Sequence, residues 1–215
     1  MLHKSADARI LLLQGPLGPF FSEFAKFLTE KGHRVYKINF NAGDRLYYQP
    51  PSTNYRGEPK DWRAFLRGYV LEHQIGAIAV YGDCRFYHTE AIKLAKLLNV
   101  KVMVFEEGYL RPDFITLEPN GANNYSEMCF TGMEDYPEHR EETFSVGNSF
   151  RERMTYASKY YNVSRIKKNS FPDYQHHRKL SPLFEGTCWV RSFARKAIYP
   201  AIQNKPLKRL LNDYK

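Results

Sequence analysis

Two adjacent glutamates, Glu106 and Glu107, end an apolar run and are the most informative polar pair in the chain. A carboxylate at a strand end can act as a general base or stabilise positive charge in a transition state. Successive strand side chains point to opposite faces, so at most one of the two can face a given crevice. Tyr109 and Arg111 follow closely, and a guanidinium can hold a phosphate or carboxylate with two hydrogen bonds. We therefore predict Glu106 and Glu107 as catalytic candidates, and Tyr109 and Arg111 as substrate-binding residues. The structural alternative is that one glutamate caps a helix and pairs with Arg111.

A second polar group follows another apolar run, at Asp83, Arg85 and His88. An acid, a base and an imidazole within six residues can bind a charged substrate or move a proton. The same residue types can also pack inside the protein with their hydrogen bonds satisfied. We predict all three as substrate-binding residues and keep the structural alternative open.

The third candidate is the loop Gln14-Gly15-Pro16-Leu17-Gly18-Pro19, which separates a short apolar run from an amphipathic segment. Gly15 and Gly18 allow the backbone to approach a ligand at a helix N-terminus, which favours anionic groups. The spacing is not that of a dinucleotide fingerprint, and the two prolines remove two amide donors. We predict a rigid loop that shapes an acceptor or sugar pocket, with Gln14, Gly15 and Gly18 in contact with substrate. The alternative is a stiff strand–helix turn without a ligand.

Four apolar runs predict the strands that position these residues, and three amphipathic segments predict the helices between them. The strands are expected at 9–13, 33–40, 77–83 and 100–108, and the helices after 20, after 61 and after 89. This alternation implies a Rossmann-like α/β domain, with a parallel sheet covered by helices on both faces. Ligands bind outside the carboxyl ends of the strands in such a sheet. All three polar groups follow strands, so we predict one shared site.

The remaining segments are less regular. Residues 41–60 are rich in Pro, Gly and Asn and predict a loop. Asp61 and Thr89 are expected to cap the helices that follow them. A short strand and turn are expected at 115–121, and helical, basic sequence from 150 onward. We predict a Rossmann-like domain at 1–150 and a basic helical extension at 151–215.

The charge is divided unevenly along the chain. Residues 151–215 hold 15 Lys and Arg against four Asp and Glu, whereas the whole protein has a net charge of +9. Such asymmetry indicates an anionic partner: a membrane surface, a nucleic acid or a phosphorylated substrate. The alternative is a solvated helical face whose partner is missing from this chain. No RNA-binding signature is present and the tail aromatics recur at helical spacing, so we expect no nucleic acid.

Cysteine and hydropathy patterns exclude several classes. Three scattered cysteines without CxxC or Cys/His spacing support neither a disulfide framework nor a zinc site, and we expect no metal. No run has the apolar length of a signal peptide core or of the ~20-residue membrane span. We expect a cytoplasmic protein that is peripheral on the inner membrane.

Three long stretches resemble the capsule polysaccharide biosynthesis/export family: "LLLQGPLGPFFSEFAKFLTEKGHRVYKINFNAGD", "YGDCRFYH" and "FEEGYLRPDFITLEPNGAN". The resemblance implies a GT-B-like architecture of two Rossmann-like domains facing a cleft. It also implies a retaining glycosyltransferase that moves β-linked 3-deoxy-D-manno-oct-2-ulosonic acid (Kdo) from CMP-Kdo to a phosphatidylglycerol-type lipid, without a further cofactor. Glu106 and Glu107 match the family's acidic-acidic-Gly-aromatic motif, in which one carboxylate lines the active site. Residues 14–19 match its Gly-Pro loop.

The chain departs from the family pattern in one respect. Members are nearly twice as long, and neither their later aspartate-bearing strand nor their nucleotide-binding His-Pro motif has a counterpart here. We expect a fragment with the first domain and part of the bridging helices, unable to complete the reaction alone. The alternative is a non-catalytic Rossmann-like module that docks on the membrane or on other capsule-assembly proteins.

Overall fold

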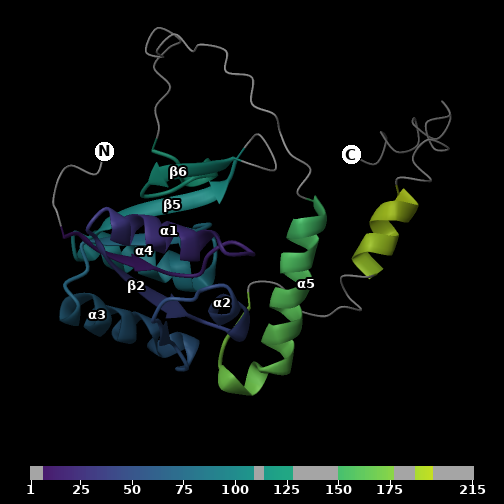
Figure 1. The fold of residues 1–215 in the computed structure, drawn as a ribbon, viewed down its shortest axis with the longest axis horizontal. Helices are drawn as coiled ribbons and strands as arrows, with labels where there is room; N and C mark the ends of the chain where they lie inside the picture. The colour runs from purple at the N-terminus through teal and green to yellow at the C-terminus, as the bar shows by residue number, and fades with distance from the viewer. Residues whose placement is uncertain (1–6, 109–113, 128–149, 177–186, 196–215) are drawn as a thin grey trace, which may run out of the picture. The chain divides into compact units, whose positions relative to one another are not determined.

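A six-stranded sheet forms the centre of the fold in the computed structural model, which describes residues 7–108, 114–127, 150–176 and 187–195 (Figure 1). The strand order is β3-β2-β1-β4-β5-β6. Only β6 runs antiparallel to its neighbour, and the other four pairings are parallel. This is the strand order of a Rossmann fold, in which the sheet reverses its direction of growth between β1 and β4. The strands are β1 (Arg9–Leu12), β2 (Arg34–Asn39), β3 (Thr53–Asn54), β4 (Ala77–Tyr81), β5 (Lys101–Glu107) and β6 (Ile115–Pro119).

Helices cover both faces of the sheet. Helix α1 buries Phe21, Ala25 and Leu28 against one face, and α3 and α4 pack on the other. Helix α5 lies beside the short helix α2 (Figure 1). The helices are α1 (Phe20–Glu30), α2 (Ala42–Leu46), α3 (Trp62–Glu72), α4 (Phe86–Leu97), α5 (Phe150–Ile166), a further helix at 187–195, and the 3₁₀ turns at Pro59–Asp61, Asn123–Tyr125 and Lys168–Ser170.

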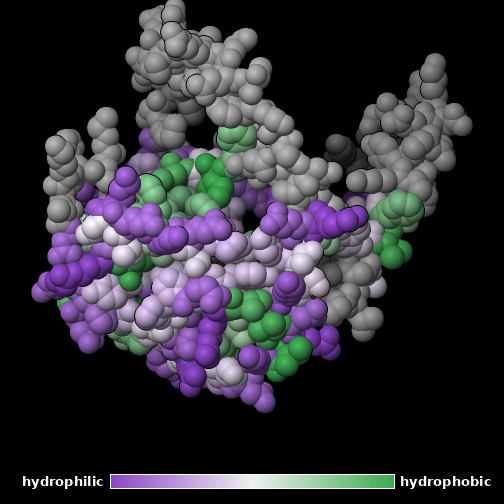
Figure 2. Space-filling model, viewed as in Figure 1, coloured by the Kyte–Doolittle hydropathy of each residue, from purple (hydrophilic) through white to green (hydrophobic). Residues whose placement is uncertain are grey.

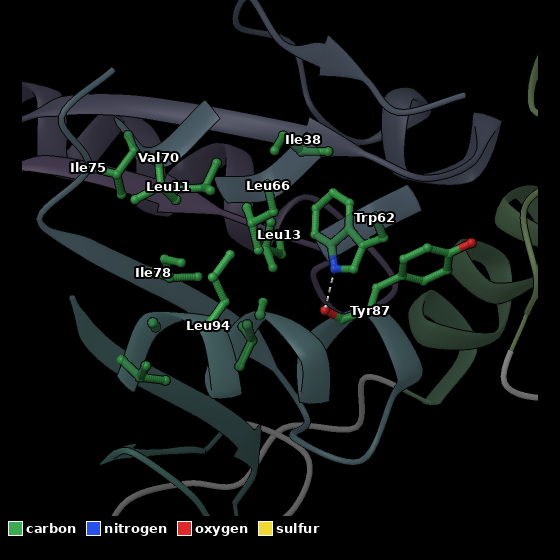
Figure 3. Packing of buried hydrophobic residues seen from close by; sticks show 14 of the residues in the cluster. Leu11, Leu13, Ile38, Trp62, Leu66, Val70, Ile75, Ile78, Tyr87 and Leu94 are labelled. Atoms are coloured by element: carbon green, nitrogen blue, oxygen red, sulfur yellow. Dashed lines mark hydrogen bonds between the residues drawn. The ribbon is translucent and has the colours of Figure 1, made fainter. Parts of the chain in front are cut away.

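The larger core cluster lies between the sheet and the α3/α4 pair. Trp62 is fully buried there, and its indole N–H donates to the backbone carbonyl of Tyr87 at 2.9 Å (Figure 3). Leu66 and Val70 lie one and two turns further along α3 and pack against the same cluster. A buried indole needs such an acceptor, so this hydrogen bond fixes the start of α3 against α4.

The face of the molecule seen in Figure 2 is mainly hydrophilic, and its hydrophobic residues gather in small patches. One patch lies at the β6 edge of the sheet (Figure 2). Strand β6, the last strand of the sheet, exposes Ile115 and Leu117.

The predicted α/β class, with a mainly parallel sheet covered on both faces, is confirmed. The four predicted strands and three predicted helices are present, and the short strand expected at 115–121 is β6.

The prediction that residues 41–60 form only a loop is wrong, because α2, β3 and a 3₁₀ turn lie there. Asn41 caps α2, and its side-chain oxygen accepts from the backbone N–H of Asp44 at 2.9 Å. Of the two predicted caps, Asp61 occupies the N-cap position of α3, but it is the last residue of a 3₁₀ turn and its side chain makes no cap bond. The cap predicted at Thr89 is wrong. Helix α4 begins before Thr89, whose hydroxyl donates to the carbonyl of Asp83 at 2.8 Å.

Contacts divide the chain into a unit of Met1–Gln175, which includes α5, and a unit of His176–Lys215. The helix at 187–195 in the second unit exposes Trp189, Val190 and Phe193. No helix in the described residues is long and apolar enough to cross a bilayer. The domain boundary at 150 and the second Rossmann-like domain stay predictions.

Candidate functional site

The loops after β1 and β4 meet at the carboxyl edge of the sheet, where the strand order reverses. Arg85 bridges them, because its Nη1 donates to the carbonyl of Gly15 at 3.4 Å. The Cβ of any residue replacing Gly82 would lie 3.6 Å from Glu106 Oε2 and 3.9 Å from Arg85 Nε. The carboxylate and the guanidinium therefore flank the same backbone position. The structure thus brings together one member of each of the three predicted groups, Gly15, Arg85 and Glu106.

The two glutamates occupy different surroundings. On β5, Val102 and Val104 belong to the cluster on the α3/α4 face, whereas Phe105 packs with α1. Strand alternation then puts Glu106 on the α3/α4 face and Glu107 on the α1 face. Glu106 is half-buried and accepts from the backbone N–H of Glu107 at 3.1 Å, while the Glu107 side chain is exposed. Of the pair, only Glu106 is placed beside Gly82 and Arg85.

Asp83 is buried and supports the backbone around it. Its Oδ2 accepts from the backbone N–H of Ala122 at 3.0 Å, which ties the turn after β6 to the end of β4. Its Oδ1 accepts from the thiol of Cys84 at 3.1 Å. This hydrogen bond, partial burial and the charges of Asp83 and Glu106 raise the pKa of the exposed Cys84 thiol. The Cys84 thiol at the rim of the site is therefore protonated at neutral pH. The predicted substrate contact of Asp83 stays a prediction.

His88 is completely buried in the first turn of α4. Its Nδ1 lies 2.6 Å from the carbonyl of Gly82, so the imidazole supports the turn that carries Gly82. Gly82 has a φ of +75°, a conformation that side chains other than glycine's rarely adopt. A ligand could reach His88 only if the surrounding chain moved, and its predicted substrate contact stays untested.

Gln14 is buried in a polar network rather than open to solvent. Its amide nitrogen lies 3.1 Å from Asp44 Oδ1, 2.8 Å from the Tyr160 hydroxyl and 3.0 Å from the Tyr174 hydroxyl. Tyr160 also accepts from Asn41 at 2.7 Å and donates to Asp44 at 3.0 Å. Burial and the nearby Asp44 charge raise the pKa of both phenols, which stay neutral and can donate. In this arrangement Gln14 joins the loop after β1 to α2 and α5.

Helix α5 packs against the Gly-Pro loop through residues four apart. Tyr156, Tyr160 and Ser164 share one helical face, and Ser164 accepts from the backbone N–H of Gly43 at 3.1 Å. Gly18 has a φ of +116°, and a Cβ there would meet the Tyr156 ring at 2.9 Å. A Cβ on Gly43 would meet the Tyr160 ring at 2.5 Å. Both glycines thus make room for helix α5, and a ligand contact by Gly18 stays a prediction.

Sequence reasoning did not single out the buried network around Asp44. The available signal was the position of Asn41 and Asp44 just after a predicted strand, at the ligand edge of the sheet. It also missed Glu118, a buried carboxylate besides Asp44 and Asp83, on β6 opposite Val104. Tyr109 and Arg111 lie outside the described residues. Within the described ranges, no three His, Cys, Asp or Glu side chains are grouped so that they could hold a metal ion.

Comparison with known proteins identifies the family. Residues 76–213 match the family model described as capsule polysaccharide biosynthesis protein. The capsule polysaccharide export protein KpsS of Escherichia coli is 38% identical over 211 residues, which cover 95% of this chain and 54% of the relative. The capsule polysaccharide modification protein LipB of Neisseria meningitidis serogroup B is 37% identical over 191 residues, which cover 82% of this chain and 44% of the relative. The chain thus spans about half the length of the curated relatives it matches. It belongs to the capsule polysaccharide biosynthesis family.

Proposed function

We propose that this chain forms the acceptor-binding domain of a retaining glycosyltransferase in capsule polysaccharide biosynthesis and export. The reaction would transfer β-linked Kdo from CMP-Kdo to a phosphatidylglycerol-type lipid. The observation that carries the proposal is the placement of Glu106 and Arg85 beside Gly82, at the edge where the sheet order reverses. Open α/β sheets bind their ligands at this place.

The two side chains suit the two polar parts of such an acceptor. Arg85 can bind the phosphodiester, since a guanidinium forms strong, charge-assisted hydrogen bonds to phosphate oxygens. Glu106 can accept a hydrogen bond from an attacking glycerol hydroxyl and take its proton as a general base. The carbonyl of Gly15 already binds Arg85 and limits the directions in which the guanidinium can point. The acceptor would thus be oriented without a cofactor.

The relatives' names support the capsule context, since one is called an export protein and another a modification protein. Because the chain spans about half of their length, binding of the sugar nucleotide and the transfer itself are proposed for the whole-length architecture. For this chain the proposal is confined to acceptor binding and proton removal.

Acceptor binding can be measured by calorimetric titration with a short-chain phosphatidylglycerol kept below its micelle concentration. Glu106→Gln should weaken saturable binding about tenfold, because a hydrogen bond to a charged group contributes ~1.5–3 kcal/mol. Glu107→Gln is the matched control, since it removes the same charge from the neighbouring residue on the other face, and it should change affinity less than about twofold. Equal effects of the two variants, or no saturable binding by the unmodified chain, would contradict the proposal.

A second candidate function, docking on an anionic membrane, is favoured by the exposed cations of α5. Arg151, Arg153, Lys159 and Arg165 all have exposed side chains on this helix. Basic residues near an anionic bilayer contribute roughly 1 kcal/mol each. This function would place the protein at the cytoplasmic face of the inner membrane, alone or with other capsule-assembly proteins.

Co-sedimentation with phosphatidylglycerol vesicles tests the docking function. Binding at low salt should fade near ~0.5 M salt, where screening is strong. The double variant Arg153→Gln/Lys159→Gln should bind less, whereas Glu106→Gln should bind like the unmodified chain. A chain that ignores anionic vesicles at low salt would rule out docking through α5.

A further inference from the structure

Lys37 is a buried ammonium group with too few partners. Its side chain is 2% exposed in the middle of β2. Among the described residues its Nζ has one hydrogen-bond acceptor, the carbonyl of Ile38 at 2.7 Å, and it lies 5.7 Å from the centre of the Tyr48 ring. An ammonium carries three protons, so two remain without an acceptor there.

Asp44 is the negative charge that acts on Lys37, but its carboxylate is engaged elsewhere. Its oxygens accept from the backbone N–H of Phe40 at 3.0 Å, from the Tyr160 hydroxyl at 3.0 Å and from the Gln14 amide. None of the ion pairs within the described ranges joins Lys37 to Asp44. Asp44 therefore moderates the cost of burying Lys37 without forming a salt bridge to it.

A cavity of about 20 Å³ lies against Lys37. The Gly-Pro loop lines one side of it through Gly15 and Gly18, and Tyr47 and Tyr48 line another. Asp44 and Tyr160 also border the cavity. A cavity of this size holds one water molecule or one oxygen atom of a larger group, since a water needs roughly 10–15 Å³.

We propose that this cavity binds one oxygen of an oxyanion, a carboxylate or a phosphate, with Lys37 as its counter-ion. A buried charge is costly unless it is paired as well as hydrogen-bonded. Asp44 borders the cavity, but its oxygens already accept from Phe40, Tyr160 and Gln14, and it forms no salt bridge to Lys37. The remaining ammonium protons are therefore available to an acceptor in the cavity. The tyrosines make the cavity wall polar and aromatic, which suits an anionic group attached to a sugar or glycerol body.

The site shares Gly15 with the one proposed around Glu106, but its charged group lies on the other face of the sheet. Ile38 belongs to the cluster on the α3/α4 face, so its neighbour Lys37 points to the α1 face, where Phe21 and Tyr48 pack. Glu106 lies on the α3/α4 side of β5. The inference therefore does not depend on the proposed acceptor site, and either can fail without the other.

The protonation of Lys37 reports on occupancy. Burial lowers the pKa of Lys37 to about 8, and the charge of Asp44 opposes this decrease. An anion that binds only the ammonium form must raise that pKa. At a ligand concentration nine times Kd, the acid dissociation constant of Lys37 should fall tenfold by linkage.

The experiment follows the ¹³Cε signal of Lys37 through a pH titration of the lysine-labelled chain, in chloride, inorganic phosphate or acetate at one ionic strength. Lys37→Met or Lys37→Arg identifies the signal by its loss. If the pKa of Lys37 rises in phosphate alone or in acetate alone, that salt identifies the class of anion. If it rises in both salts, the cavity binds either kind of oxyanion. The same pKa in all three salts would overturn the proposal and leave water as the occupant.

Thermal unfolding provides an independent readout. Phosphate or acetate should raise the Tm of the unmodified chain and of Lys60→Met, a control that removes an exposed lysine, but not the Tm of Lys37→Met. An equal rise in all three proteins would show a general salt effect and would also overturn the proposal.

Discussion

Replacing Tyr160 with phenylalanine removes one hydroxyl from the buried network that joins α5 to the sheet. The residue is 4% exposed, and its hydroxyl donates to Asp44 and accepts from Asn41 and Gln14. A hydrogen bond to a charged group contributes ~1.5–3 kcal/mol, and an orphaned buried donor such as the Asn41 amide costs ~1–3 kcal/mol. Gln14 keeps other acceptors, and the more apolar ring recovers part of the loss. We expect a net loss of about 3 kcal/mol in the free energy of unfolding.

Urea unfolding followed by circular dichroism measures this loss of free energy. In thermal unfolding, the Tm of a domain of this size should fall by about 6–12 °C. Tyr156→Phe is the control, because its hydroxyl bonds to the exposed Glu152 of the same helix, and it should change stability little. Amide exchange should increase in α5 of Tyr160→Phe before it increases in β1. A Tyr160→Phe protein as stable as Tyr156→Phe would refute the idea that the network holds α5 in place.

Two further predictions concern Lys37 and Gly18. The folded pKa of Lys37 is about 8 against an ordinary 10.5, so the unfolded chain binds more protons between these values. The stability of the unmodified chain relative to Lys37→Met should therefore rise by up to ~2–3 kcal/mol from pH 8 to 10 in chloride. Tyrosines such as Tyr48, whose pKa is raised to about 12, titrate in both proteins and cancel from this difference. A pH-independent difference between the two proteins would contradict the prediction. Gly18→Ala should cost about 1–3 kcal/mol in thermal unfolding, because its φ is +116° and the Tyr156 ring is close, whereas Gly68→Ala, in an open part of α3, should stabilise by ~0.5–1 kcal/mol. A stable Gly18→Ala protein would show that the loop adapts.

The sheet could be predicted because its strands are short, apolar runs separated by helical periodicity. The strand β1, for example, is a four-residue segment with three fully buried residues, and it sits centrally between β2 and β4. The five-residue helix α2 could not be predicted in this way, since it is too short to show a hydrophobic period. Its cap, Asn41, is also a typical loop residue. The cap expected at Thr89 was wrong because α4 already begins at Phe86, and the Thr89 hydroxyl donates to the carbonyl of Asp83 instead.

The sequence pattern was enough to predict that the candidate site lies at one edge of the sheet. It was not enough to predict the role of each side chain there. Gln14 and Tyr160 are 146 residues apart in sequence, and their hydrogen bond exists only because α5 returns to the loop after β1. His88 and Asp83 have the same residue types as ligand-binding groups, yet both support neighbouring backbone. Local pattern gives the position of such groups, whereas long-range packing decides which of them a ligand can reach.

The paired glycines and prolines of the loop can now be explained by contacts on both of its sides. A Cβ on Gly15 would lie 3.0 Å from the Phe21 ring, and the space beside Gly18 holds Tyr156. Pro19 is the N-cap residue of α1, and its carbonyl accepts from the backbone N–H groups of Ser22 and Glu23. Packing against α1 and α5 therefore fixes the shape of the loop, and the carbonyl of Gly15 is the group it presents to Arg85. If a ligand binds at this edge, its recognition depends mainly on the side chains that follow β4 and β5, with the loop as a rigid wall.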